Sequence, residues 1–140
     1  MVDLVPPGLP LTDPATSARM RKIRQADTDP EQRVRAVLRS LGATYRICVK
    51  ALPGSPDIAN RRGGWAIFVH GCFWHGHSCR GGRLPKTNTA FWEQKIDANQ
   101  KRDANKCRLL RRLGFRVLTV WQCETKYPER LAGRLQRFLG

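Results

Sequence analysis

The chain has 140 residues, a length that suits a single domain with a modest hydrophobic core. Its 26 lysines and arginines against 11 acidic residues give a net charge of +15, which favours nucleic acid as a partner. The alternative is a soluble basic protein without a specific partner. The longest apolar run, Trp65 to Val69, is too short to span a membrane, and the lack of a secretory signal and the odd cysteine count favour the cytoplasm.

The N-terminal region is expected to be an arm followed by a short basic helix. Residues 1–15 hold four prolines and predict a flexible arm. The remaining residues, 16–140, are predicted to form one domain. Its first helix is expected over residues 16–25, with Met20 and Ile23 as its apolar residues among arginines and lysines.

A second helix is predicted to begin at Asp29, which would act as its N-cap, with Pro30 in the first turn. Apolar residues recur at helical spacing from Val34 to Leu41, and Gly42 is expected to end the helix. This spacing places the apolar side chains on one face, which would pack against a core.

Short strands are expected to follow this helix. Polar and apolar residues alternate over 44–49, which predicts a half-buried strand. A turn at 53–56 leads into extended chain at 57–59, and a second turn at 60–64 leads into a continuous apolar strand at 65–69. The last of these strands is expected to be central in the sheet, because it has no polar face.

The second half of the chain predicts two more helices and one more strand. A basic loop is expected over 80–88, followed by a helix over 89–113 that Gly114 closes. A strand over 115–121 precedes an amphipathic terminal helix, marked by Leu131, Leu135, Phe138 and Leu139. This order of elements predicts an α/β domain with a mixed sheet.

All three histidines and two of the five cysteines lie within residues 70–79. Cys72, His77 and Cys79 have the spacing C-x4-H-x-C, and tetrahedral zinc requires a fourth ligand. Cys123 is the best candidate, because it follows the last expected strand just as Cys72 follows the central one. If those strands are parallel neighbours, both cysteines emerge at one edge of the sheet. A closed set of four ligands predicts a structural zinc ion.

Other interpretations of the cysteines stay open. The cluster could consist of three free cysteines and a surface histidine, although so dense a pattern rarely arises by chance. Cys48 and Cys107, on an expected strand and an expected helix, are interpreted as small apolar residues and not as ligands.

These residues resemble the very-short-patch repair endonucleases over about residues 16–139. The similar motifs are Phe68-Val69-His70-Gly71-Cys72-Phe73-Trp74-His75 with His77 and Cys79, Leu52-Pro53-Gly54-Ser55-Pro56-Asp57, Phe91-Trp92-Glu93-Gln94-Lys95-Ile96, Asn99, Arg102-Asp103 and Val120-Trp121-Gln122-Cys123. The resemblance implies a restriction-endonuclease-like fold, with a central mixed β-sheet flanked by helices. It also implies a strand-specific, Mg²⁺-dependent endonuclease that nicks duplex DNA 5′ of the mispaired T at T:G mismatches, which arise when 5-methylcytosine deaminates.

The resemblance also implies roles for individual residues. Asp57 and the main-chain carbonyl of Val69 would bind Mg²⁺. His75 would be the catalytic histidine and Asp103 its carboxylate partner, while Glu31 and His70 would support the active site. The zinc ligands would be Cys72, His77, Cys79 and Cys123. The residues that meet DNA would be Phe73, Trp74, Trp92, Met20, Lys95 and Asn99.

Double-stranded DNA with a T:G mismatch is the implied partner, with mismatch-repair proteins as further candidates, and a monomer is expected.

The chain departs from the family at three places. Val69 stands where the family usually has threonine, and Gly76 and Ser78 lie where histidines are frequent. The acid-x-lysine half of the restriction-enzyme signature is absent, and Phe68-Val69-His70 stands in its place. A histidine-based mechanism is therefore required.

Elementary chemistry is compatible with this assignment. Asp57 offers hard oxygen ligands of the kind that Mg²⁺ prefers, and a histidine such as His75 titrates near neutrality, at about pH 6.5 when unperturbed. The alternatives are a turn-forming Asp57, a His75 that contacts the zinc shell or a phosphate, and core packing of the aromatic rings. For the whole chain the alternatives are a zinc module that binds DNA without catalysis and a related nuclease with another target.

Overall fold

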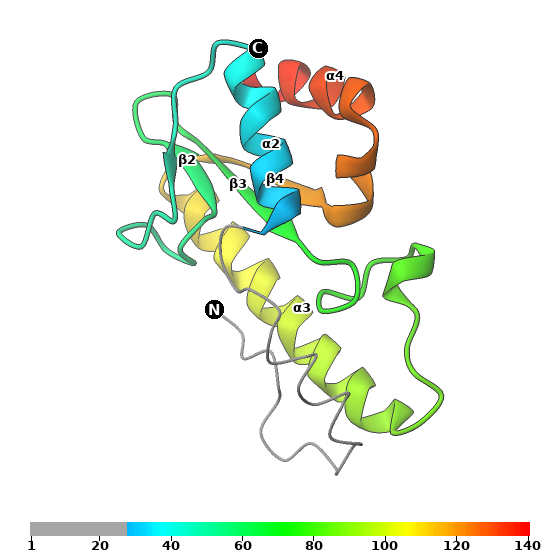
Figure 1. Cartoon of the computed structure of the whole chain (residues 1–140). Helices are drawn as coiled ribbons and strands as arrows, with labels where there is room; N and C mark the ends of the chain where they lie inside the picture. The colour runs from blue at the N-terminus through cyan, green and yellow to red at the C-terminus, as the bar shows by residue number, and fades with distance from the viewer. Residues whose placement is uncertain (1–27) are drawn as a thin grey trace.

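The structure is a computed structural model that describes residues 28–140, so the predicted arm and the predicted helix over 16–25, with Met20, lie outside the described residues. Its elements in chain order are α2 (Asp29–Ser40), β1 (Arg46–Ile47), β2 (Ile58–Asn60), β3 (Trp65–His70), η1 (Arg80–Gly82), α3 (Thr89–Arg112), β4 (Arg116–Trp121), η2 (Gln122–Lys126) and α4 (Pro128–Leu139), as Figure 1 shows. Within this range the helices and strands follow the predicted order.

The four strands form one mixed sheet in the order β1-β2-β3-β4. The pairs β1–β2 and β2–β3 are antiparallel, whereas β3 and β4 run parallel from Trp65 opposite Arg116 to His70 opposite Trp121. The strand over 65–69 is therefore central, as predicted. Because β3 and β4 are parallel, the segments that follow them leave the sheet at the same edge.

Helices cover both faces of the sheet, with α2 and α4 side by side on one face and α3 on the other (Figure 1). Alternate residues of β3 supply the two cores, because successive side chains of a strand point to opposite faces. Trp65 and Ile67 pack with the helices α2 and α4, and Ala66 and Phe68 pack with α3. The three layers confirm the predicted α/β architecture.

The ends of α2 correct one prediction and confirm another. Thr28, in extended conformation, caps the helix by accepting a hydrogen bond from the backbone N–H of Glu31, at 3.5 Å. Asp29 is the first helical residue, so its prediction as the N-cap is wrong by one position. Gly42, at a φ of +75°, ends the helix as predicted.

The strand predicted over residues 44–49 is wrong in length and burial. Only Arg46 and Ile47 pair with β2, and 48% of the Ile47 surface is exposed. The backbone turns at Cys48, whose φ of +49° is incompatible with a continuing strand. Cys48 is also exposed, so its predicted packing is wrong, whereas Cys107 packs against the core beneath α3, as predicted.

Candidate active site

The expected catalytic residues converge at the carboxyl end of β3 from four separate segments. His70 is the last residue of β3, and Asp57 directly precedes β2, whose antiparallel pairing brings its start to the same place. Asp103 comes from α3, and Glu31 comes from the first turn of α2. In an α/β sheet this edge is the usual position of a functional site.

The carboxylate of Asp57 is buried against the backbone of β3. Its Oδ2 accepts a hydrogen bond from the backbone N–H of Val69 at 2.7 Å, so the carboxylate lies next to the residue whose carbonyl is the second expected Mg²⁺ ligand. Burial raises the pKa of Asp57 to about 6, against the Val69 hydrogen bond, and the charge of the buried Glu31 raises it further. A buried oxygen donor beside a second carboxylate has the chemistry of a divalent-cation site.

His70, His75 and Asp103 form a compact cluster whose ligand atoms all lie within 4.8 Å of one another. The Nδ1 atom of His75 lies 2.5 Å from Oδ2 of Asp103, and Nε2 of His70 lies 3.9 Å from Oδ1. An ionised carboxylate can only accept hydrogen bonds, so Nδ1 of His75 donates and its Nε2 keeps a free lone pair. Nε2 of His75 can therefore accept a proton from a water molecule.

His70 differs from His75 in its environment. It is 7% exposed, and burial lowers its pKa to about 4, with a further contribution from the charge of His75 and an opposing one from Asp103. A histidine with this pKa stays neutral throughout the neutral pH range. His70 can therefore support the cluster as an uncharged ring.

The structure brings the four expected zinc ligands together. The ligand atoms of Cys72, His77, Cys79 and Cys123 all lie within 4.8 Å of one another, and Sγ of Cys123 is 3.6 Å from Nδ1 of His77. Two ligands at about 2.3 and 2.0 Å from one tetrahedral ion would be about 3.5 Å apart. The spacing and the three-cysteine, one-histidine donor set therefore fit Zn²⁺.

The surroundings of the three thiols shift their pKa values in different directions. The hydrogen bond with His77 lowers the pKa of Cys79 to about 6, whereas burial raises the pKa of Cys72 to about 12 and also raises that of Cys123. Three thiolates so close together repel one another unless a cation lies between them. A closed set of four such ligands is typical of a structural zinc ion.

Trp121 joins the two clusters, and the sequence did not single it out as a site residue. Its ring stacks on His77 at 4.3 Å between centroids and meets the edge of His70 at 5.4 Å. Trp121 is opposite His70 in the parallel register, which explains how one ring reaches both histidines. The register could be found only once β3 and β4 were known to be neighbours.

The loop that carries His75 is hydrogen-bonded to α3 at three consecutive carbonyls. The side-chain amide of Asn99 donates to the carbonyl of Trp74 at 2.8 Å. The amide of Gln100 donates to the carbonyls of His75 and Gly76, at 3.2 and 3.3 Å. Gln100 was not predicted, although it directly follows Asn99 on the same helix. Both residues fix the position of the His75 ring relative to Asp103.

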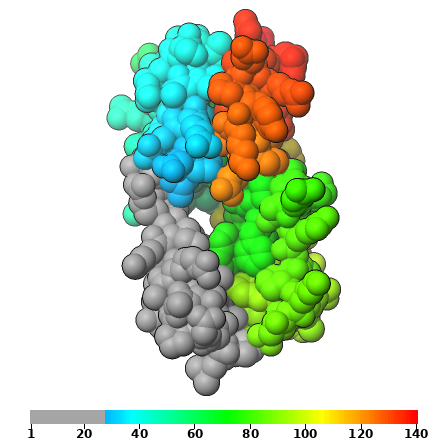
Figure 2. Space-filling view, turned by 45° about the vertical axis from the view of Figure 1, so that its right-hand side comes forward, coloured from blue at the N-terminus to red at the C-terminus, as the bar shows by residue number. Residues whose placement is uncertain are grey.

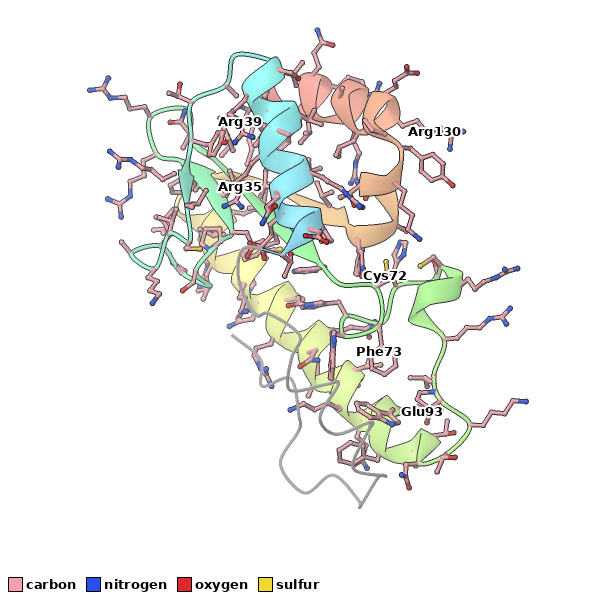
Figure 3. The ribbon with its side chains drawn as sticks, in the orientation of Figure 1. Arg35, Arg39, Cys72, Phe73, Glu93 and Arg130 are labelled. Atoms are coloured by element: carbon pink, nitrogen blue, oxygen red, sulfur yellow. The ribbon has the colours of Figure 1, made fainter. Side chains whose placement is uncertain are left out.

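Three aromatic rings form a cluster between this loop and α3. Phe73, Trp74 and Trp92 meet edge to face, with centroids 5.2 to 5.9 Å apart. Figure 3 shows Cys72 and Phe73 in the loop after β3, with Phe73 directed toward α3. In Figure 2 the segment that contains this loop (green) forms a patch of surface below the segment of η2 and α4 (orange to red).

The residues expected to contact DNA differ in exposure. Phe73, Trp74 and Lys95 are half-buried. Trp92 is only 5% exposed, and Asn99 is fully buried with its amide bonded to the loop, so these two residues support the surface from beneath. Their predicted contacts with DNA stay predictions.

Comparison with known proteins gives a consistent result. The family model described as DNA mismatch endonuclease Vsr matches residues 11–81. The chain is 46% identical to the type II nicking enzyme V.XorIIP of Xanthomonas oryzae over 120 residues, which cover 86% of the chain and 88% of that relative. It is 41% identical to the type II nicking enzyme V.NmeAIP of Neisseria meningitidis (92% and 95% covered) and 42% identical to the DNA mismatch endonuclease Vsr of Escherichia coli (85% and 77% covered). The chain therefore belongs to the Vsr family of DNA mismatch and nicking endonucleases.

Proposed function

We propose that this endonuclease nicks duplex DNA on the 5′ side of the mispaired T at T:G mismatches, with Mg²⁺ as cofactor, and so starts very-short-patch repair in the bacterial cytoplasm. The observation that carries the proposal is the His75–Asp103 pair at the end of β3, where the charge of His75 also acts on the buried Asp57 carboxylate. A module that only binds DNA would not need these three groups together. The name of the Escherichia coli relative supports a mismatch as the target.

In this mechanism His75 is the general base. Its Nε2 would take the proton from the attacking water, while Asp103 holds the ring through Nδ1 and stabilises the imidazolium that forms. Asp57 and the carbonyl of Val69 would hold Mg²⁺, which when bound supplies Lewis-acid polarisation of the scissile phosphate. His70 packs against His75 as a neutral ring and limits its rotation.

The proposed structural zinc ion would be held by Cys72, His77, Cys79 and Cys123. These residues come from the loop after β3 and from η2 after β4, so the ion would tie two chain segments that are far apart in sequence. With four protein ligands there is no open position for chemistry. The role of the ion would be to fix the loop that carries His75.

The aromatic cluster is proposed to recognise the mismatch. Phe73 and Trp74 are partly exposed, and rings that insert between base pairs unstack a step at a cost of a few kcal/mol, which is smallest where pairing is already weak. Buried Trp92 would support them from α3. Lys95 would add a contact to the DNA backbone, and Met20, outside the described residues, would approach from the minor groove.

A related nuclease of different specificity is the second candidate, because two of the relatives named above are described as type II nicking enzymes. The test uses duplexes labelled on each strand, with all single mismatches in several sequence contexts, in the presence of MgCl₂. The proposal requires nicking of the T-containing strand at T:G and none in paired DNA. Equal nicking of another mismatch or of a paired site would favour the second candidate. Tight binding without nicking of any substrate would favour a non-catalytic module.

Asp57→Asn serves as the matched control, since it keeps the side-chain shape and the acceptor for the Val69 N–H. This variant should bind the duplex and fail to nick it. Sedimentation of the enzyme alone and with DNA would check the expected monomer. Mismatch-repair proteins are further candidate partners, and adding them to the enzyme–DNA mixture before sedimentation would test for a complex.

A further inference from the structure

The inward face of α3 carries a lysine next to the proposed active site. Residues at helical spacing on this face contact the sheet, the loop after β3 or the turn before β2, and they are Trp92, Ile96, Asn99, Asp103, Lys106 and Leu110. Lys106 is half-buried, one turn from Asp103 on one side and from the fully buried Leu110 on the other. A half-buried lysine packs its methylene stem against the fold and keeps its charged ammonium hydrated at the end of that stem.

The stem of Lys106 lies directly on the turn that leads to Asp57. A Cβ atom at Gly54 would lie 2.7 Å from both Cβ and Cγ of Lys106, and Gly54 has a φ of +76°. Only glycine fits both the close approach and the left-handed backbone at that position. The contact holds the stem of Lys106 against Gly54, which is three residues before the proposed Mg²⁺ ligand Asp57 in the sequence.

The charge of Lys106 acts on two residues of the site. Lys106 is among the groups that lower the pKa of Asp57 and that of His70. Within residues 28–140 its ammonium has no carboxylate within 4.0 Å, so it forms no short ion pair there. Lys106 therefore places a positive charge near Asp57 without forming a short ion pair with its carboxylate.

We propose that Lys106 is a positioning residue that offsets the negative charge around Asp57 while the metal site is empty and so opposes the entry of a divalent cation into the free enzyme. The proposal rests on the proposed function, in which Asp57 binds Mg²⁺. A phosphate group of bound DNA adds negative charge at the same place and would restore the attraction for the metal. Metal loading would thus be coupled to DNA binding, as two ligands of one site are coupled through their charges.

The experiment measures Mg²⁺ affinity of the zinc-loaded protein without DNA, from the rise of Tm with MgCl₂ at constant ionic strength and at about pH 8, where Asp57 is ionised. Lys106→Met keeps an unbranched stem on Gly54 and removes the charge. We expect its half-saturating Mg²⁺ concentration to fall at least about threefold. Lys106→Gln, a second neutral variant, should show the same decrease if the methionine variant does not fold, and Lys106→Arg should retain the wild-type value.

Two controls separate the possible failures. Lys101→Met changes an exposed lysine of the same helix that pairs with Asp97, and it should leave the Mg²⁺ dependence unchanged. Asp57→Asn should abolish that dependence. If Asp57→Asn abolishes it and neither neutral variant of Lys106 shifts it, the role of Lys106 is refuted and the metal site stands. If Asp57→Asn leaves the dependence intact, the proposed metal site itself is refuted.

Discussion

The imidazole rings of His70 and His75 stack face to face, with 3.8 Å between their centroids and 6° between their planes. Both rings reach the carboxylate of Asp103, His75 at hydrogen-bond distance and His70 farther away. Two imidazolium ions at this distance would repel each other, so a charge on one ring disfavours a charge on the other. Burial lowers the pKa of His70 to about 4, so this ring is neutral near pH 7, and under the proposed function His75 is the ring that accepts the proton.

His75→Ala is therefore expected to lower the nicking rate by about 10²–10⁴-fold with little change in DNA affinity. His70→Phe keeps a flat, neutral ring against His75 and should reduce the rate less. The measurement is the single-turnover rate as a function of pH, with binding followed separately by fluorescence anisotropy. If the acidic limb of the pH–rate profile disappeared in His70→Phe, the assigned roles of the two histidines would be reversed.

Asp57→Asn is expected to stabilise the protein in the absence of Mg²⁺. The folded pKa of Asp57 is raised from 3.8 to about 6, so this group binds more protons in the folded state and stability falls as pH rises through that window. The variant removes this penalty, and its free energy of unfolding should rise by about 3 kcal/mol at about pH 7.5 and by only about 1 kcal/mol at about pH 4.5. Urea unfolding at both pH values tests this, and an equal gain at both would mean that ionisation of Asp57 is not the cause.

Cys79→Ser is expected to release zinc and to destabilise the protein by about 4 kcal/mol or more, since a structural metal contributes directly to folding. Cys48→Ser is the matched control, because Cys48 is exposed and remote from the cluster in sequence. Elemental analysis and thermal unfolding of both variants provide the measurement. Wild-type zinc content in Cys79→Ser would remove this residue from the ligand set.

Trp74→Ala is expected to reduce the preference for T:G over paired DNA by roughly tenfold, because each base–aromatic stacking contact contributes about 1–3 kcal/mol. Tyr127→Ala, which removes an exposed ring at the start of α4, is the control and should leave the preference unchanged. Competition between mismatched and paired duplexes measures the ratio. Equal discrimination by Trp74→Ala and the wild type would exclude the wedge role.

Much of the fold could be predicted because its main elements have strong local signals. The continuous apolar run of β3 and the closing glycine of α3 gave bounds that agree with the structure to within one residue. The spacing of Cys72, His77 and Cys79 is likewise local, and Cys123 followed from the parallel pairing of two expected strands. Family membership then confirms the endonuclease prediction and the restriction-endonuclease-like fold.

Other features depend on contacts between distant segments, which periodicity does not contain. The alternation over 44–49 predicted a half-buried strand, yet an edge strand has one neighbour and the backbone turns at Cys48. From sequence alone, Lys106 and Gln100 could not be told apart from solvent-exposed polar residues of a helix. Their contacts became visible only when the orientation of α3 on the sheet was known. Trp121 lies between the cluster of His70 and the cluster of His77 because it pairs with His70 in the parallel register of β3 and β4.

The length of α3 has a consequence for how DNA recognition can diverge among relatives. Its 24 residues span about 36 Å, whereas the six residues of β3 span about 20 Å, so the helix continues beyond the sheet (Figure 1). The part near Asp103 lies beside the proposed catalytic groups, and the projecting part carries Trp92 and Lys95. One additional turn near the helix start would move the projecting end by about 5.4 Å and leave Asp103 in place. Under the proposed function, a change at the projecting end of this helix would therefore alter DNA contacts and leave the proposed catalytic groups in place.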